Sequence, residues 1–117
     1  MEKELVLTID CGTQGIRAIV FDKTGRALAK TEKRFEGYYS KKPHYVEAPP
    51  AMFWEDLASV TLEMKRRYPE YIAALSGMNI AAQRDIATIV DEKGEGLRDF
   101  ISWMDRRTPE KPFTNPQ

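Results

Sequence analysis

Three strand-like segments separated by two glycine-containing turns fill the first 36 residues, and this pattern constrains the fold more than any other feature. The first segment, 5–9, is apolar and β-branched, and it runs into Asp-Cys-Gly-Thr-Gln-Gly at 10–15. The segments 17–22 and 26–36 follow, separated by Lys-Thr-Gly at 23–25. Short strands joined by tight turns pair as hairpins. The N-terminal third therefore predicts a three-stranded sheet.

One amphipathic helix is predicted over 51–68. Acidic residues at 55–56 suit its first turn, and basic residues at 65–67 suit its last turn. Its apolar positions recur at helical spacing, at Phe53, Leu57, Val60 and Met64. Pro69 is expected to end the helix, and the proline-containing segment 37–50 before it is expected to be a surface loop.

The second half of the chain predicts further strands. Residues 75–82 are apolar enough for a buried strand, and 86–91 predict another. A turn at 92–96 leads to the apolar segment 100–103, which is expected to pair next. The order is βββαβ with a further hairpin, which is an α/β fold with a mixed sheet.

Composition narrows the possible functions. The 117 residues suit one domain or part of one, and 18 Lys+Arg balance 18 Asp+Glu, so no basic field favours nucleic acid. A single cysteine and a single histidine exclude an internal disulfide and the usual zinc sites. No signal peptide or membrane-spanning segment is recognisable. We therefore expect a cytoplasmic protein that binds neither membranes nor nucleic acid.

The turn at 10–17 is the first candidate site, because it has the groups that bind a phosphate. Phosphate sites use exposed backbone N–H groups, a hydroxyl and a cation, and a carboxylate is added where magnesium accompanies the phosphate. The turn supplies them all: Gly12 and Gly15 for close backbone approach, Thr13 for a hydroxyl, Gln14 for an amide, Arg17 for a cation and Asp10 for a carboxylate. No Walker lysine follows. An ordinary hairpin turn remains an open interpretation.

Two further candidates lie in the second half. Gln83, Arg84 and Asp85 interrupt two apolar segments, and an acid beside an arginine suits the hydroxyl groups of a polyol. A surface ion pair at the strand end is the alternative. The indole of Trp103 suits the carbon face of a sugar, although tryptophan also commonly packs in cores.

Four segments, taken in order, resemble the opening of a carbohydrate kinase of the FGGY family, which includes glycerol kinase and xylulokinase. They are 7–17, 45–54, 82–85 and 101–107. The resemblance implies the N-terminal part of an actin-like ATPase domain of ribonuclease H-like type. It places this partial domain at 1–109 and a linker or truncated continuation at 110–117.

The same resemblance assigns roles and partners. It implies ATP and Mg²⁺ as cofactors and a sugar or polyol as substrate. It implies that Asp10 holds magnesium through water, that Gly12, Thr13, Gln14, Gly15 and Arg17 bind the phosphates, and that Arg84, Asp85 and Trp103 bind the substrate. It also implies a C-terminal kinase domain that carries the general-base aspartate, so no catalytic residue is expected in this chain. A homo-oligomer is possible.

Departures from the family keep other functions open. Gln14 and Gly15 stand where glycerol kinase has hydroxyl residues, and Asp85 replaces a glutamate, so glycerol is not assigned as the substrate. We expect the isolated chain to be inactive. The alternatives are a non-catalytic phosphate-binding or sugar-binding module, a truncated product, and a ribonuclease H-like nuclease that uses Asp10 with Asp85 or Asp91.

Overall fold

An antiparallel hairpin sheet forms the N-terminal third, as predicted. The computed structural model describes residues 4–107, so the expected linker at 110–117 lies outside the described residues. Strands β1 (Leu5–Cys11), β2 (Gly15–Phe21) and β3 (Ala27–Arg34) pair in succession. The second turn places Gly25 at φ 85°, a left-handed conformation in which glycine carries no side-chain penalty.

A fourth strand makes the sheet mixed. Strand β5 (Leu75–Ala82) pairs in parallel with β1, which gives the order β3-β2-β1-β5. A parallel neighbour requires a long crossover, and the helical segment between β3 and β5 provides it. The mixed sheet predicted from the sequence is confirmed.

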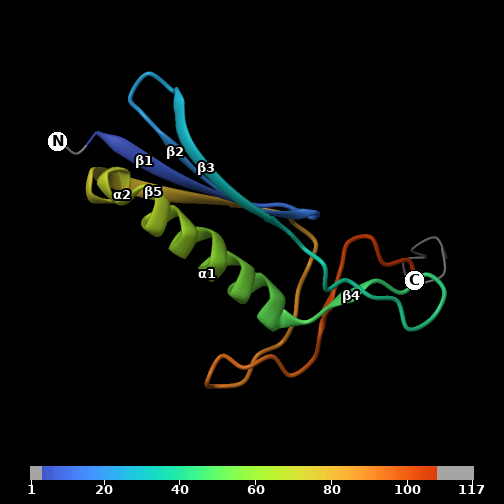
Figure 1. Cartoon of the computed structure of the whole chain (residues 1–117). Coiled ribbons are helices and arrows are strands. Elements are labelled where there is room, and N and C mark those ends of the chain that lie inside the picture. The colour runs from blue at the N-terminus through green and yellow to red at the C-terminus, as the bar shows by residue number, and fades with distance from the viewer. Residues whose placement is uncertain (1–3, 108–117) are drawn as a thin grey trace, which may run out of the picture.

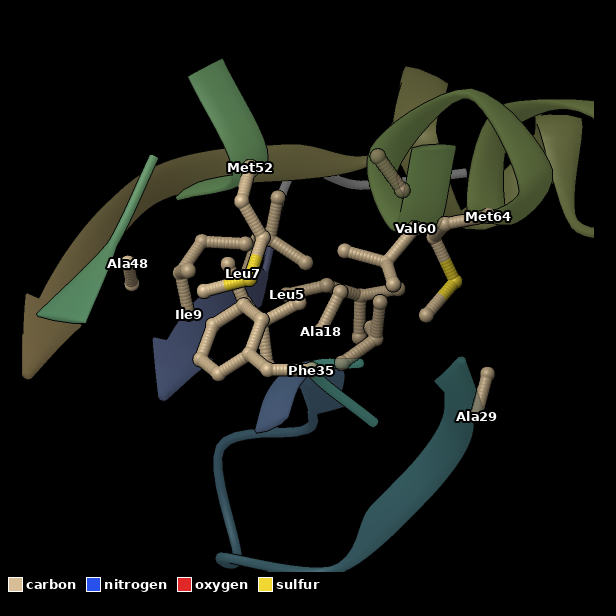
Figure 2. Close-up of a cluster of buried hydrophobic side chains, with 13 residues drawn as sticks. Leu5, Leu7, Ile9, Ala18, Ala29, Phe35, Ala48, Met52, Val60 and Met64 are labelled. Atoms are coloured by element: carbon tan, nitrogen blue, oxygen red, sulfur yellow. The ribbon is translucent and has the colours of Figure 1, made fainter. Parts of the chain in front are cut away.

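The core lies between one face of this sheet and helix α1 (Pro50–Arg67), which runs along that face (Figure 1). Val60 and Met64 of α1 are fully buried, and Figure 2 shows them directed toward the apolar side chains of the strands. The Thr31 hydroxyl of β3 donates a hydrogen bond to the Val60 carbonyl at 2.7 Å. Apolar burial together with this satisfied polar contact fixes α1 on the sheet.

The predicted end of the helix just before Pro69 is confirmed, whereas its first turn needs correction. Helix α1 begins at Pro50, so Asp56 lies beyond its first turn, where it is buried and pairs with Lys33 Nζ at 2.8 Å. Pro69 does not simply end the helical region, because it begins a short helix α2 (Pro69–Ala73). Proline is well tolerated in a first helical turn, since the N–H that it lacks would have no helical partner there.

The burial predicted for 75–82 was wrong, although the strand itself is confirmed. Met78 and Ile80 of β5 are 59% and 61% exposed. β5 is an edge strand, and the fully buried residues of its sheet belong to β1 and β2. The strand predicted at 86–91 was also wrong, because that segment forms only isolated bridges, at Ala87 and Val90. An apolar run needs an adjacent strand to pair with, and within residues 4–107 no strand extends along this one.

A small second sheet corrects the prediction of a loop at 37–50. Strand β4 (Glu47–Ala48) pairs with β6 (Phe100–Ile101), and both β4 residues are buried. Phe100 packs edge-to-face on Phe53 of α1, with ring centroids 5.0 Å apart. The apolar segment near residue 100 therefore pairs as a strand with β4, which precedes the helix, and meets the segment 86–91 only through the isolated bridge between Ala87 and Ile101. None of the helices within residues 4–107 is both long and apolar enough to cross a membrane.

Candidate phosphate and sugar site

The loop between β1 and β2 is held tightly against the end of β3. The Gly12 N–H donates to the Gly15 carbonyl at 3.0 Å, and the Phe35 N–H donates to the Gln14 carbonyl at 2.9 Å. A Cβ on Gly15 would lie only 2.5 Å from the Lys33 carbonyl oxygen. Glycine at this position lets the two backbones approach closely, so the loop has a defined shape.

Backbone donors in this loop remain available to a ligand. Within residues 4–107, the N–H groups of Thr13 and Gln14 donate to no protein acceptor. Adjacent free N–H groups in a tight turn form a cradle for an anion. A cavity of about 550 Å³ opens beside the loop. It is lined by Asp10, Gly12, Thr13, Gln14, Gly15, Ile16, Arg17, Glu32, Lys33 and Arg34.

Opposite charges meet at one wall of this cavity. Asp10, near the end of β1, lies directly across from Arg17 at the start of β2, and the two side chains form an ion pair. The Arg17 side chain is about half exposed, so an incoming anion can reach it. The pair brings a carboxylate and a guanidinium to the same cavity, as the sequence predicts.

Three segments far apart in the sequence meet at Thr13 through hydrogen bonds. The indole Nε1–H of Trp103 donates to Thr13 Oγ1 at 2.8 Å, and the Thr13 hydroxyl donates to Gln83 Oε1 at 3.2 Å. Gln83 Nε2 donates to the Gly12 carbonyl at 3.1 Å. A carbonyl only accepts hydrogen bonds, so this contact fixes which end of the Gln83 amide faces Thr13.

Gln83, which holds Thr13 and Gly12 through its side-chain amide, is the site residue that the sequence reasoning missed. The sequence places it in a polar cluster with Arg84 and Asp85 and indicates no separate role for it. Its backbone N–H donates to the Cys11 carbonyl at 2.8 Å, so it continues the pairing of β5 with β1 just beyond the end of β5. The signal in the sequence was a long amide directly after an apolar strand.

The other residues predicted to bind substrate stand at the same end of the sheet. Arg84 and Asp85 follow β5 and are exposed, and Asp85 has a φ of 60°. Neither side chain forms an ion pair or a hydrogen bond with another residue in the described range 4–107, so the alternative of a local ion pair is not seen there. Their role in binding a substrate stays a prediction.

Cys11 ends β1, directly after Asp10, and it packs against the hydrophobic core. Partial burial raises the pKa of its thiol, and the neighbouring Asp10 charge raises it further. A thiol with a raised pKa stays protonated at neutral pH and is a poor nucleophile. Cys11 therefore fits a packing role.

The residues present suit a magnesium ion that is held through coordinated water rather than by several protein ligands. In the part of the chain that the structure describes, no three His, Cys, Asp or Glu side chains come together as a metal site. Asp10 is a single carboxylate that lines the cavity beside the β1–β2 loop. Magnesium commonly keeps several waters and binds through one or two carboxylates plus phosphate oxygens, and one carboxylate suits that arrangement.

Comparison with known proteins identifies the family. Residues 5–112 match the model of the N-terminal domain of the FGGY family of carbohydrate kinases. The chain belongs to this family. A glycerol kinase from Burkholderia pseudomallei is 33% identical over 109 residues, which are 92% of this chain and 22% of that protein.

Solved structures of FGGY kinases confirm the fold. A xylulose kinase from Rhodospirillum rubrum superposes with a TM-score of 0.80 at 24% identity, over 88% of this chain and 21% of that one. A glycerol kinase from Plasmodium falciparum, solved with ADP, superposes with a TM-score of 0.72 at 20% identity, over 91% of this chain and 21% of that one. The FGGY chain described here therefore has the actin-like ATPase fold, and it spans about a fifth of the length of these relatives.

Proposed function

We propose that the polypeptide containing this chain transfers the γ-phosphoryl group of ATP to a hydroxyl group of a sugar or polyol. Membership of the FGGY family supports kinase activity on a carbohydrate. The relatives include a glycerol kinase and a xylulose kinase, so the substrate class is a small polyhydroxy compound rather than one particular sugar. Phosphoryl transfer depends chiefly on positioning and on neutralising charge.

The β1–β2 loop is assigned to the phosphates. The free N–H groups of Thr13 and Gln14 would donate to phosphate oxygens, and Gly12 and Gly15 would let the backbone come close. Arg17 would neutralise charge on the transferred group. Bound magnesium would draw negative charge from the phosphates, and Asp10 would hold it through coordinated water. Each of these side chains or backbone groups lines the same cavity.

The end of β5 and the segment after β6 are assigned to the sugar. Asp85 would accept hydrogen bonds from hydroxyl groups, and Arg84 would donate to them. The indole ring of Trp103, which is 54% exposed, would lie against the carbon skeleton. An apolar ring face together with hydroxyl-binding polar groups is the chemistry that a sugar requires.

The hydrogen bond between Trp103 and Thr13 is the observation that carries this proposal. It joins a residue assigned to the sugar and a residue assigned to the phosphates at 2.8 Å. Transfer between two bound molecules requires reacting atoms about 3–3.5 Å apart. A direct contact between the two half-sites supports that proximity.

Calorimetry on this chain tests the two halves separately. We expect Arg17→Gln to weaken MgATP binding and leave polyol binding unchanged, and Asp85→Asn to do the reverse. Glu92→Gln, in the exposed turn after 91, is the matched control. Equal affinities for both ligands in wild-type protein and in both site variants would refute the assignment.

Turnover separates the proposal from its alternatives. We expect no transfer by the isolated chain, because the family places the general base in later sequence. Transfer by the full-length enzyme that is lost in Arg17→Ala would support the kinase. Binding of ligands without transfer by the full-length polypeptide would indicate a binding module, and metal-dependent cleavage of an RNA–DNA hybrid would indicate a nuclease.

A further inference from the structure

A second wall of the phosphate cavity comes from β3, which no sequence motif assigned to the site. Glu32, Lys33 and Arg34 line the cavity together with the β1–β2 loop. They are the last three residues of the strand, where it meets the loop. The cavity therefore has charged groups on both sides.

Backbone contacts place Arg34 beside the loop. Arg34 lies directly opposite Gly15 in the β2–β3 register. A Cβ on Gly15 would lie 3.1 Å from the Arg34 Cα, and the following residue, Phe35, donates its N–H to the Gln14 carbonyl. The position of Arg34 is thus set by the same close approach that shapes the loop.

The neighbouring charges along β3 already have partners. Lys33 Nζ contacts the buried Asp56 carboxylate at 2.8 Å, and Glu32 contacts Lys30 Nζ at 3.4 Å. Arg34 is exposed, and its guanidinium makes no ion pair or hydrogen bond with other residues between 4 and 107. It is the cavity-lining cation whose charge is not offset there.

Arg17, on the neighbouring strand β2, is the cation that the family motif supplies. Its guanidinium is engaged by Asp10, which offsets part of its charge. A triphosphate carries more negative charge than one partly neutralised arginine can balance. A guanidinium can also bind two phosphate oxygens at once, which a lysine cannot do with the same geometry.

We propose that Arg34 is a second phosphate-binding residue, which contacts the phosphate chain of the nucleotide from the β3 side of the cavity. The inference rests on the proposed function, because it takes the phosphate-binding role of the loop as given. It extends the site from one hairpin turn to a cleft between that turn and the end of β3.

Titration with magnesium tripolyphosphate and with MgATP tests this inference by calorimetry. We expect Arg34→Gln to lower the affinity for both ligands about 3- to 10-fold, as is typical for one charge-assisted contact at a partly exposed site. Arg34→Lys should retain part of the affinity. Arg26→Gln, just before the start of the same strand, is the matched control and should bind like wild type.

The outcomes separate the inference from the proposed function. If Arg17→Gln weakens tripolyphosphate binding and Arg34→Gln stays within about twofold of wild type, the role of Arg34 is refuted and the phosphate loop stands. If wild-type protein binds neither tripolyphosphate nor MgATP, both the role of Arg34 and the proposed phosphate-binding role of the loop are refuted. If Arg26→Gln weakens binding as much as Arg34→Gln, the effect is one of general charge and the inference fails. A weaker dependence of affinity on salt in Arg34→Gln would support a direct ionic contact.

Discussion

Replacing Gly15 with alanine tests whether the close approach of β2 and β3 shapes the phosphate loop. The new Cβ would lie 2.5 Å from the Lys33 carbonyl oxygen and 3.1 Å from the Arg34 Cα. Both are backbone atoms, so no side chain can rotate away. Ordinary van der Waals contact requires about 1 Å more room at the first of these contacts.

The two strands must therefore separate where their ladder reaches the loop. Overpacking of this kind costs about 1–3 kcal/mol in the free energy of unfolding. The hydrogen bond from the Phe35 N–H to the Gln14 carbonyl lies next to the clash, and it should lengthen as well. We accordingly expect Gly15→Ala to lower both stability and tripolyphosphate affinity.

Gly77→Ala is a matched control in the same sheet. A Cβ at Gly77 would meet no atom within 4 Å. Alanine at an unstrained glycine position reduces the entropy of the unfolded chain and stabilises by about 0.4–1 kcal/mol. The two substitutions are chemically identical, so they differ only in the space around the new methyl group.

Urea unfolding followed by far-ultraviolet circular dichroism measures both effects. We expect the midpoint to fall for Gly15→Ala and to stay level or rise for Gly77→Ala, with equal slopes. A Gly15→Ala protein as stable as wild type would show that the strands separate without cost. The argument for a tightly shaped loop would then be refuted.

Three further predictions concern the core and the ionisable groups. Met64→Ala should lower the free energy of unfolding by about 2–5 kcal/mol, because Met64 is fully buried, and a urea midpoint near wild type would contradict this. The Arg107 guanidinium and the Val46 N–H lower the pKa of Asp105, so its contribution to stability is complete above about pH 4 and is lost as the pH falls toward the depressed pKa. Asp105→Asn should therefore show a smaller loss of stability in acid-unfolding measurements than wild type, and an identical pH profile would contradict the assignment. The hydrogen bond to Asp99 raises the pKa of Tyr39 to about 12, so an ultraviolet titration should show this tyrosine ionising near pH 12, and Asp99→Asn should lower its pKa.

The features predicted correctly depend on residues close together in the chain. The hairpin of β1 and β2 follows from β-branched runs around a glycine turn, and α1 follows from apolar spacing. The loop between β1 and β2 contains, within one short segment, the groups predicted to bind phosphate, because a tight turn and its neighbouring side chains are local. Asp10 and Arg17 lie only seven residues apart, and the hairpin register alone brings them together.

The errors in the strand predictions concern which other parts of the chain pack against or pair with a segment. An apolar run such as 75–82 indicates a strand, but its exposure depends on whether another layer covers it, and α1 packs on the other strands. The run 86–91 lacks a strand to pair with along its length. β4 was missed because two residues form a strand only when a distant partner, here β6, completes the hydrogen bonds.

The sequence by itself determined the hairpin, the helix, the family and the composition of the phosphate loop, because each is encoded in short-range spacing or in contiguous motifs. Only the tertiary structure decided that Trp103 and Gln83 hold the Thr13 hydroxyl, and that Arg34 faces the same cavity as Arg17. Those contacts join residues from different strands and loops, with up to 90 positions between them in the chain. Chain folding brings such residues together, and no local pattern records which distant side chains will meet.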